Sequence, residues 1–217
     1  MPTAGDVAAL LGAARTRVRS ARVLLEDFTD PQTTLKAWRQ GPYADTAELD
    51  NPGLLGLPKE PTTLKVGQWL DLENDRAREE RGGLVLVKVG PRWWTSESTS
   101  GEEPASTLEL VDALRRWTDP QPLTRLMELE PAGETEVLGR KALLVNATAR
   151  GETAYDVALA PLGWGAERWE LAVDAERGIL LGTTALVGDT PFRRVTPLEL
   201  ALDERFADEL FAPPSGV

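Results

Sequence analysis

Hydrophobic residues at the start of the chain recur at the spacing of one helical face. The repeat covers residues 6–21 and predicts an amphipathic helix. Beyond it the pattern changes to extended segments. Residues 23–29 and 34–39 favour strands and predict a first hairpin around Asp30-Pro31. The chain is therefore expected to begin with one helix and to continue into a sheet.

The segment 41–61 has neither a helical nor a strand period and is rich in Pro and Gly. A stretch of about 20 residues without regular structure is uncommon inside a compact domain, and it is often a lid or a binding loop. Leu54, Leu55 and Leu57 cluster within it. We interpret the segment as an irregular loop or lid whose leucines pack over the mouth of a cavity.

Short apolar runs separated by Gly, Asn or Asp turns predict two groups of strands. The first group covers residues 62–72, 76–81, 84–89 and 92–97, and a polar loop follows at 98–106. The second group covers 142–149, 168–173, 179–187, 192–195 and 198–202. Clean alternation of apolar and polar residues in two of these strands, 168–173 and 198–202, indicates an antiparallel sheet with one buried face.

A helical interlude, residues 108–129, separates the two groups of strands. Its apolar spacing predicts two helices, 108–117 and 122–129. We find no internal repeat, no linker and no shift in composition that would mark a domain boundary. The pattern therefore predicts a single domain over residues 1–217.

Charge and composition narrow the classes of function. The chain has 24 Lys and Arg against 35 Asp and Glu, which gives a net charge of −11. Such a charge opposes binding to nucleic acid, because the two partners repel each other at long range. One basic patch, Arg15, Arg17, Arg19 and Arg22, runs against this trend and is interpreted as a solvated helix face.

The search for catalytic chemistry is negative. The sequence contains neither Cys nor His, which excludes disulfides, cysteine nucleophiles, histidine triads and zinc sites made of these residues. Asp71, Glu73 and Asp75 alternate as in a calcium loop, but Arg76 stands where such a loop needs Gly. We therefore expect no enzyme, no metal site and no cofactor.

The ends of the chain and its apolar runs bear on location. The N-terminus lacks the basic and apolar regions of a secretory signal, and no apolar run reaches the roughly 20 residues of a membrane span. The sequence as it stands predicts a cytoplasmic protein. A chain trimmed of its signal peptide would begin in the same way and would be extracytoplasmic.

Several short sequence motifs, taken in their order along the chain, resemble those of one family. They are the Trp93-Trp94 strand after a glycine turn, Asp119-Pro120 before a Leu-rich helix, Val137-Leu138-Gly139-Arg140, the hairpin from Trp169 through Asp174 to Gly178, and the ending Phe211-Ala212-Pro213. Together they resemble the outer-membrane lipoprotein carrier (LolA-like) superfamily, which includes sigma-factor regulatory sensors and mycobacterial lipid-binding lipoproteins. The resemblance covers most of residues 6–214 and is weakest at 41–61.

The resemblance implies an α+β fold. Its sheet would be a strongly curved antiparallel sheet, an incomplete β-barrel, with the N-terminal helix and a central helical pair on the concave face. Members of this superfamily hold acyl chains or lipids between sheet and helices. This sequence departs from them, because it lacks a lipid-attachment Cys and a signal peptide and contains only 4 Phe and 2 Met.

These observations define a predicted binding site and two possible functions. The expected ligand-binding residues lie between sheet and helices; they are Trp69, Trp94, Leu114, Trp117, Leu123, Met127, Trp169 and Leu171. The first hypothesis is non-catalytic binding of an apolar or amphipathic ligand, as a carrier or sensor. The second is a regulatory or scaffold protein that binds another protein without a ligand. An open apolar cavity would favour the first, and one filled by Leu and Trp side chains would favour the second.

Overall fold

The computed structural model describes residues 2–41, 57–96, 98–101 and 115–214. These residues form an 11-stranded sheet in the order β6-β5-β4-β3-β2-β1-β11-β10-β9-β8-β7. The strands are β1 (Ser20–Thr29), β2 (Thr62–Asp71), β3 (Arg76–Arg81), β4 (Leu84–Val89), β5 (Arg92–Thr95), β6 (Ser98–Gly101), β7 (Met127–Val137), β8 (Arg140–Ala149), β9 (Arg168–Asp174), β10 (Leu180–Val187) and β11 (Thr190–Leu202). All neighbouring strands are antiparallel.

Helices are few and mostly short. They are α1 (Ala4–Arg17), α2 (Pro31–Arg39), α4 (Leu123–Leu126) and α5 (Ala160–Gly163), with 3₁₀ turns η3 (Arg115–Trp117), η4 (Gly151–Tyr155), η5 (Val157–Leu159) and η6 (Asp208–Phe211). None of the helices in the described part of the chain has the length and apolar character that a membrane crossing requires.

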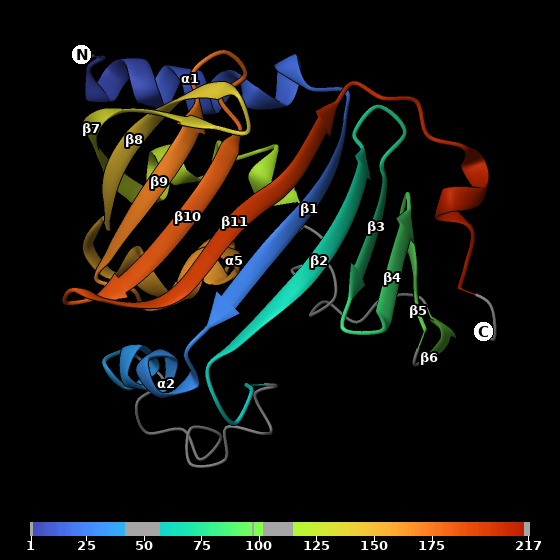
Figure 1. Ribbon diagram of the computed structural model, residues 1–217, viewed down its shortest axis with the longest axis horizontal. Coiled ribbons are helices and arrows are strands. Elements are labelled where there is room, and N and C mark those ends of the chain that lie inside the picture. The colour runs from blue at the N-terminus through green and yellow to red at the C-terminus, as the bar shows by residue number, and fades with distance from the viewer. Residues whose placement is uncertain (1, 42–56, 97, 102–114, 215–217) are drawn as a thin grey trace.

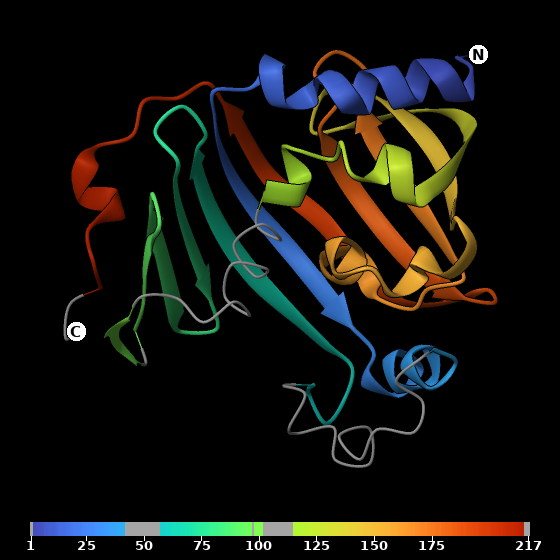
Figure 2. The same ribbon diagram turned by 180° about the vertical axis from the view of Figure 1, so that it is seen from behind.

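The sheet is curved and open. Strands β7 to β11 and β1 curl around a concave side, while β2 to β5 continue from them as a flatter wing (Figure 1). Seen from behind, α5 and the segment from η3 to α4 lie on the concave side, and α1 crosses one end (Figure 2). Strands β6 and β7 end the sheet without pairing to each other. The predicted α+β fold with an incomplete barrel is therefore confirmed.

Helix α1 forms because local capping and an apolar stripe agree. The Thr3 hydroxyl accepts a hydrogen bond from the Asp6 amide at 3.2 Å, and the Asp6 carboxylate accepts one from the Thr3 amide at 2.8 Å. Val7, Leu11 and Ala14 are buried on one face. The helix ends at Arg17, earlier than predicted, because the chain becomes extended there and enters β1.

The predicted strand 34–39 is wrong, since these residues belong to helix α2. The Asp30 carboxylate accepts a hydrogen bond from the Gln32 amide at 3.0 Å, and Pro31 occupies the first helical turn. An Asp cap followed by Pro is a strong start signal for a helix, and it outweighs the strand preference of Thr33 and Thr34. The first hairpin therefore does not form, and β1 pairs with β2 and β11 instead.

Three other boundaries differ from the prediction. The helix expected at 122–129 ends at Leu126, and β7 begins at Met127, which pairs with Ala149. Residues 192–195 and 198–202 belong to one strand, β11, because Pro197 sits at an irregularity in the ladder where its missing N–H is tolerated. The polar loop expected at 98–106 begins with strand β6.

Candidate functional site

Apolar side chains pack on the concave side of the curled part of the sheet, which consists of β7 to β11 and β1. Five predicted site residues meet there within one cluster: Trp117, Leu123, Met127, Trp169 and Leu171. Leu123 and Met127 come from the α4–β7 junction, and Trp169 and Leu171 come from β9. All five are buried. These five residues therefore share one buried cluster, and their role in ligand binding stays a prediction.

Trp169 anchors this cluster. Its side chain is 0% exposed, and its indole Nε1 donates a hydrogen bond to the Leu162 carbonyl at 3.1 Å. Leu162 lies in α5, which covers the same concave side (Figure 2). The only polar atom of the indole is thereby satisfied inside the core, as a buried Trp requires. Trp169 thus acts as a packing residue that joins β9 to α5.

Little space remains between the two layers at this point. An apolar gap of about 10 Å³ is lined by residues of β1, η3 and β10, among them Val23, Leu25, Trp117 and Leu181. A volume of this size holds about one water molecule. Sites for small-molecule ligands usually measure about 300–1,000 Å³. This gap between the described residues is therefore too small for an acyl chain.

Trp69 and Trp94 lie on the other face of the sheet. Strand register places Trp69, Arg78, Val87 and Trp94 in one row across β2 to β5. On β2, side chains alternate, so that Val66 and Leu70 are buried and Trp69 is half-buried on the opposite side. Trp69 covers Gly67, where an added Cβ would lie 2.9 Å from the indole. The two tryptophans are thus separated from Trp117 and Trp169.

The remaining predicted residues are only partly placed. Leu54 and Leu55 of the predicted lid, and Leu114 of the helical interlude, lie outside the described residues. Leu57 is half-buried. The lid therefore stays a prediction.

A polar network that the sequence analysis missed occupies the concave face of the flatter wing. The Asp27 carboxylate lies 2.9 Å from Arg193 Nη2 and 3.3 Å from Arg81 Nη1. Arg81 Nε donates to Glu79 at 3.1 Å, and Gln68 Nε2 donates to Glu79 at 2.7 Å. Asp27 and Gln68 are only 5% and 3% exposed. The signal in the sequence was Asp27 itself, which follows Ala21, Val23 and Leu25 on the buried face of β1.

Three atoms of this network are buried and have no hydrogen-bond partner among the residues that the structure describes. They are Asp27 Oδ1, Gln68 Oε1 and Arg193 Nε. Placing an acyl chain against such groups is costly, because apolar atoms cannot replace the missing hydrogen bonds. This half of the concave face is therefore chemically unsuited to a hydrocarbon ligand.

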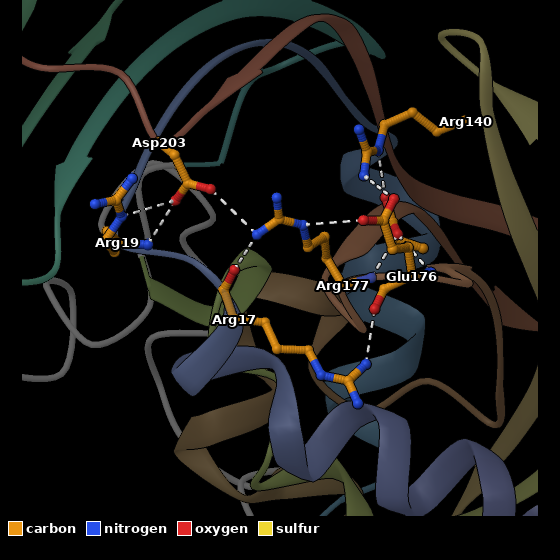
Figure 3. A network of polar contacts seen from close by, with 7 residues as sticks. Arg17, Arg19, Arg140, Glu176, Arg177 and Asp203 are labelled. Atoms are coloured by element: carbon orange, nitrogen blue, oxygen red, sulfur yellow. Dashed lines mark hydrogen bonds and ion pairs between the residues drawn. The ribbon is translucent and has the colours of Figure 1, made fainter.

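The basic patch near the N-terminus is neutralised rather than merely solvated. Arg15 lies 3.7 Å from Asp119, and Arg22 bridges Glu199 and Glu204 at 3.3 and 3.1 Å. Figure 3 shows how Arg17 contacts the turn between β9 and β10 and how Arg19 contacts the end of β11. Arg17 Nη1 donates to the Glu176 carbonyl at 2.7 Å, and the Arg19 amide donates to Asp203 at 2.9 Å.

Arg19 of this patch helps to lower the pKa of its partner Asp203. The hydrogen bond from the Arg19 amide, together with the charges of Arg177 and Arg19, holds the pKa of Asp203 below its ordinary value. The patch is thus committed to internal ion pairs.

Comparison with known proteins identifies the fold. No protein-family model matches the sequence, and no curated protein matches it. Among solved structures, MucB aligns with 98% of this chain and 63% of its own, with a TM-score of 0.57 and 18% identity. The complex of Pseudomonas aeruginosa MucA and MucB aligns with 96% of this chain and 60% of the matched chain, with a TM-score of 0.56 and 19% identity. This chain thus spans less than two thirds of these matched chains.

A mycobacterial protein shows the same architecture over its full length. LprF from Mycobacterium bovis aligns with 100% of both chains, with a TM-score of 0.50 and 12% identity. These likenesses agree with the open curved sheet and with the position of the helices on its concave side. The chain therefore has a LolA-like fold, as the sequence resemblance predicted.

Proposed function

We propose that this chain is a non-catalytic binding protein that recognises another protein through the surface of its LolA-like fold. The observation that carries the proposal is the packed concave face, where Trp117, Met127 and Trp169 are buried in one apolar cluster. Entry of a lipid would have to expel these side chains. It would also break the hydrogen bond between Trp169 and Leu162.

The cost of such a displacement argues against a carrier. Removing a large side chain from a packed core costs about 3–5 kcal/mol for Trp. The burial of an acyl chain, at about 25 cal/mol per Å² of its apolar surface, would have to contribute more free energy than this loss. A partner that binds on the surface needs no such rearrangement. The solved complex of MucB with MucA supports the proposal, since it shows a protein of this fold bound to a protein.

The carrier of an apolar or amphipathic ligand is the alternative. It differs from the proposal in one measurable property, the occupancy of the concave face. A dansyl-labelled undecanoic acid is a suitable probe, because its fluorescence rises when it leaves water. We predict that the wild-type chain gives no saturable signal with this probe, and that native mass spectrometry finds no co-purified lipid.

The variant Met127→Ala is a control for this measurement. It opens a small apolar space within the buried cluster without adding a polar group, so probe binding at the concave face should increase. A wild-type chain that carries one lipid per molecule, or that binds the probe saturably and loses it to unlabelled fatty acid, would refute the proposal and restore the carrier. A one-to-one complex with a protein, rebuilt from purified components, would support it.

A further inference from the structure

We infer that the free edge of strand β7 is the docking site for an extended basic segment of a protein partner. This inference rests on the proposed function, because it names the surface and the partner chemistry for protein binding. Strand β7 is the last strand of the sheet and pairs with β8 along one edge only. Within the part of the chain that the structure describes, no strand pairs with its other edge.

The free edge is long enough to hold a peptide. Strand β7 has 11 residues and spans roughly 36 Å at about 3.3 Å per residue. An unpaired edge presents a row of backbone N–H and C=O groups that can hydrogen-bond an added strand. A register shift between Pro131 and Gly133 divides this row, and Pro131 lacks a donor. The added strand would therefore bond to the residues on either side of this irregularity.

The charges beside the edge select the partner. Glu128, Glu130, Glu134 and Glu136 are all exposed on β7. Glu128 lies 3.8 Å from Arg150, whereas Glu130, Glu134 and Glu136 have no ion-pair partner among the described residues. Opposite charges on neighbouring strands stabilise pairing, and like charges oppose it. The register shift after Pro131 places Glu128 and Glu130 on one face of the sheet and Glu134 and Glu136 on the other. The edge thus disfavours acidic strands and a second copy of itself, and it favours a segment whose Lys or Arg side chains meet either pair.

A hollow beside the start of β7 provides room for an anchor. It measures about 340 Å³ and lies where α1, α4 and β7 meet. Small residues of α1, Ala4, Gly5 and Ala8, line it together with Thr124 and Leu129, and Glu128 and Arg150 supply its charged lining. The hollow is large enough for an apolar side chain of the docked segment. The occupant is therefore an extended segment that carries basic residues and one apolar anchor at the end that lies beside the start of β7.

Peptides of defined charge test this inference. The probe is an eight-residue peptide of alternating Lys and Val. The controls are an alternating Glu and Val peptide and an alternating Lys and Pro peptide, which keeps the charge but lacks half of the backbone donors. We expect only the Lys-Val peptide to bind and to slow amide hydrogen exchange of β7. We also expect cross-strand nuclear Overhauser effects between this peptide and β7.

Charge reversal on the chain separates edge docking from general attraction to an acidic protein. Glu130, Glu134 and Glu136, each changed to Lys, should weaken binding of the Lys-Val peptide at least roughly tenfold, since each opposite-charge pair contributes about 0.2–1 kcal/mol. The same variant should bind the Glu-Val peptide. A matched variant with Glu60, Glu73 and Glu209 changed to Lys has the same net charge and should bind the Lys-Val peptide like the wild type.

Three results would overturn the inference: equal weakening by the two triple variants, equal binding of the Lys-Pro peptide, or unchanged exchange in β7. None of these measurements probes the concave face, so none of these results would refute the proposed function. The lipid-probe measurement tests that function separately. Conversely, saturable binding of the acyl probe would refute the proposed function, while the exchange of β7 would still report on the edge.

Discussion

At the scale of single residues, strand alternation decides the role of each tryptophan. Trp69 and Trp169 look alike in the sequence, because each stands in an apolar strand. Register pairs Trp169 with Ala185 in the core and Trp69 with Arg78 on the opposite face. The same residue type therefore packs a core in one strand and covers an outer surface in the other.

This difference predicts unequal losses of stability. Trp169→Ala should lower the free energy of unfolding by about 3–5 kcal/mol, because it leaves a cavity and an unpaired Leu162 carbonyl. Trp69→Ala, at a half-buried position over Gly67, should cost less than about 2 kcal/mol. Urea unfolding followed by circular dichroism measures both. Similar losses for the two variants would show that Trp69 is also a core residue.

At the scale of elements, single capping residues decide between helix and strand. Residues 31–39 contain a Thr pair that favours a strand, yet Asp30 and Pro31 start a helix there. The Asp30 carboxylate also accepts a hydrogen bond from the Thr33 hydroxyl at 2.9 Å. The cap thus stabilises the first turn and withdraws Thr33 from strand pairing.

The cap of α2 can be tested by substitution. Asp30→Ala should destabilise the chain by about 1 kcal/mol, because the Gln32 amide loses its acceptor. Asp30→Asn should retain most of the stability, since Asn is an equally good cap. Thermal unfolding of the three chains measures the difference. A loss of equal size in both variants would assign the effect to the charge of Asp30 rather than to capping.

At the scale of the whole molecule, one polar network ties together segments that are far apart in the sequence. Figure 3 shows Arg140, Arg177 and Asp203 in this network, which joins the end of α1, the β9–β10 hairpin and the end of β11. Arg177 donates to Asp203 at 3.1 Å and also to the Arg17 carbonyl. The N-terminal helix is thereby fixed to the end of β11, the last strand in the sequence.

Ionisation of Asp174 makes the stability of this network depend on pH. Its carboxylate accepts hydrogen bonds from Arg140 and from the amides of Glu176 and Arg177, the latter two at 2.9 and 2.7 Å. Burial by itself would raise the pKa of Asp174, but these hydrogen bonds outweigh it and the pKa lies below its ordinary value. Its contribution to stability is therefore complete above the unfolded pKa of about 4 and is lost as the pH falls through the folded value.

We predict that Asp174→Asn is about 2 kcal/mol less stable than the wild type at pH 7, and that the difference shrinks below about pH 4. Urea unfolding between pH 3 and 7 measures the two slopes. Asp189→Asn is the control, because the Asp189 side chain is fully exposed and should leave the slope unchanged. Parallel pH profiles for Asp174→Asn and the wild type would contradict the assignment.

The sequence by itself determined the fold class and most of the strands. Alternation in β9 and in the second half of β11 could be read directly, because side-chain period reflects local backbone geometry. The order of elements and the local phrases led to the LolA-like fold, which the structural comparison confirms. The edge strand β7 was missed, since Met127 and Leu129 fit the helical spacing of the preceding residues as well as a strand.

Only the tertiary structure decided how side chains pack on the concave face. Composition gave the number of large side chains, but packing density depends on how facing layers meet. Trp117, Met127 and Trp169 converge from segments that are distant in the chain and meet in one buried apolar cluster. Register likewise separated Trp69 from Trp169 and gathered Asp27, Arg81 and Arg193 into one network. Such contacts depend on long-range pairing, which local pattern does not encode.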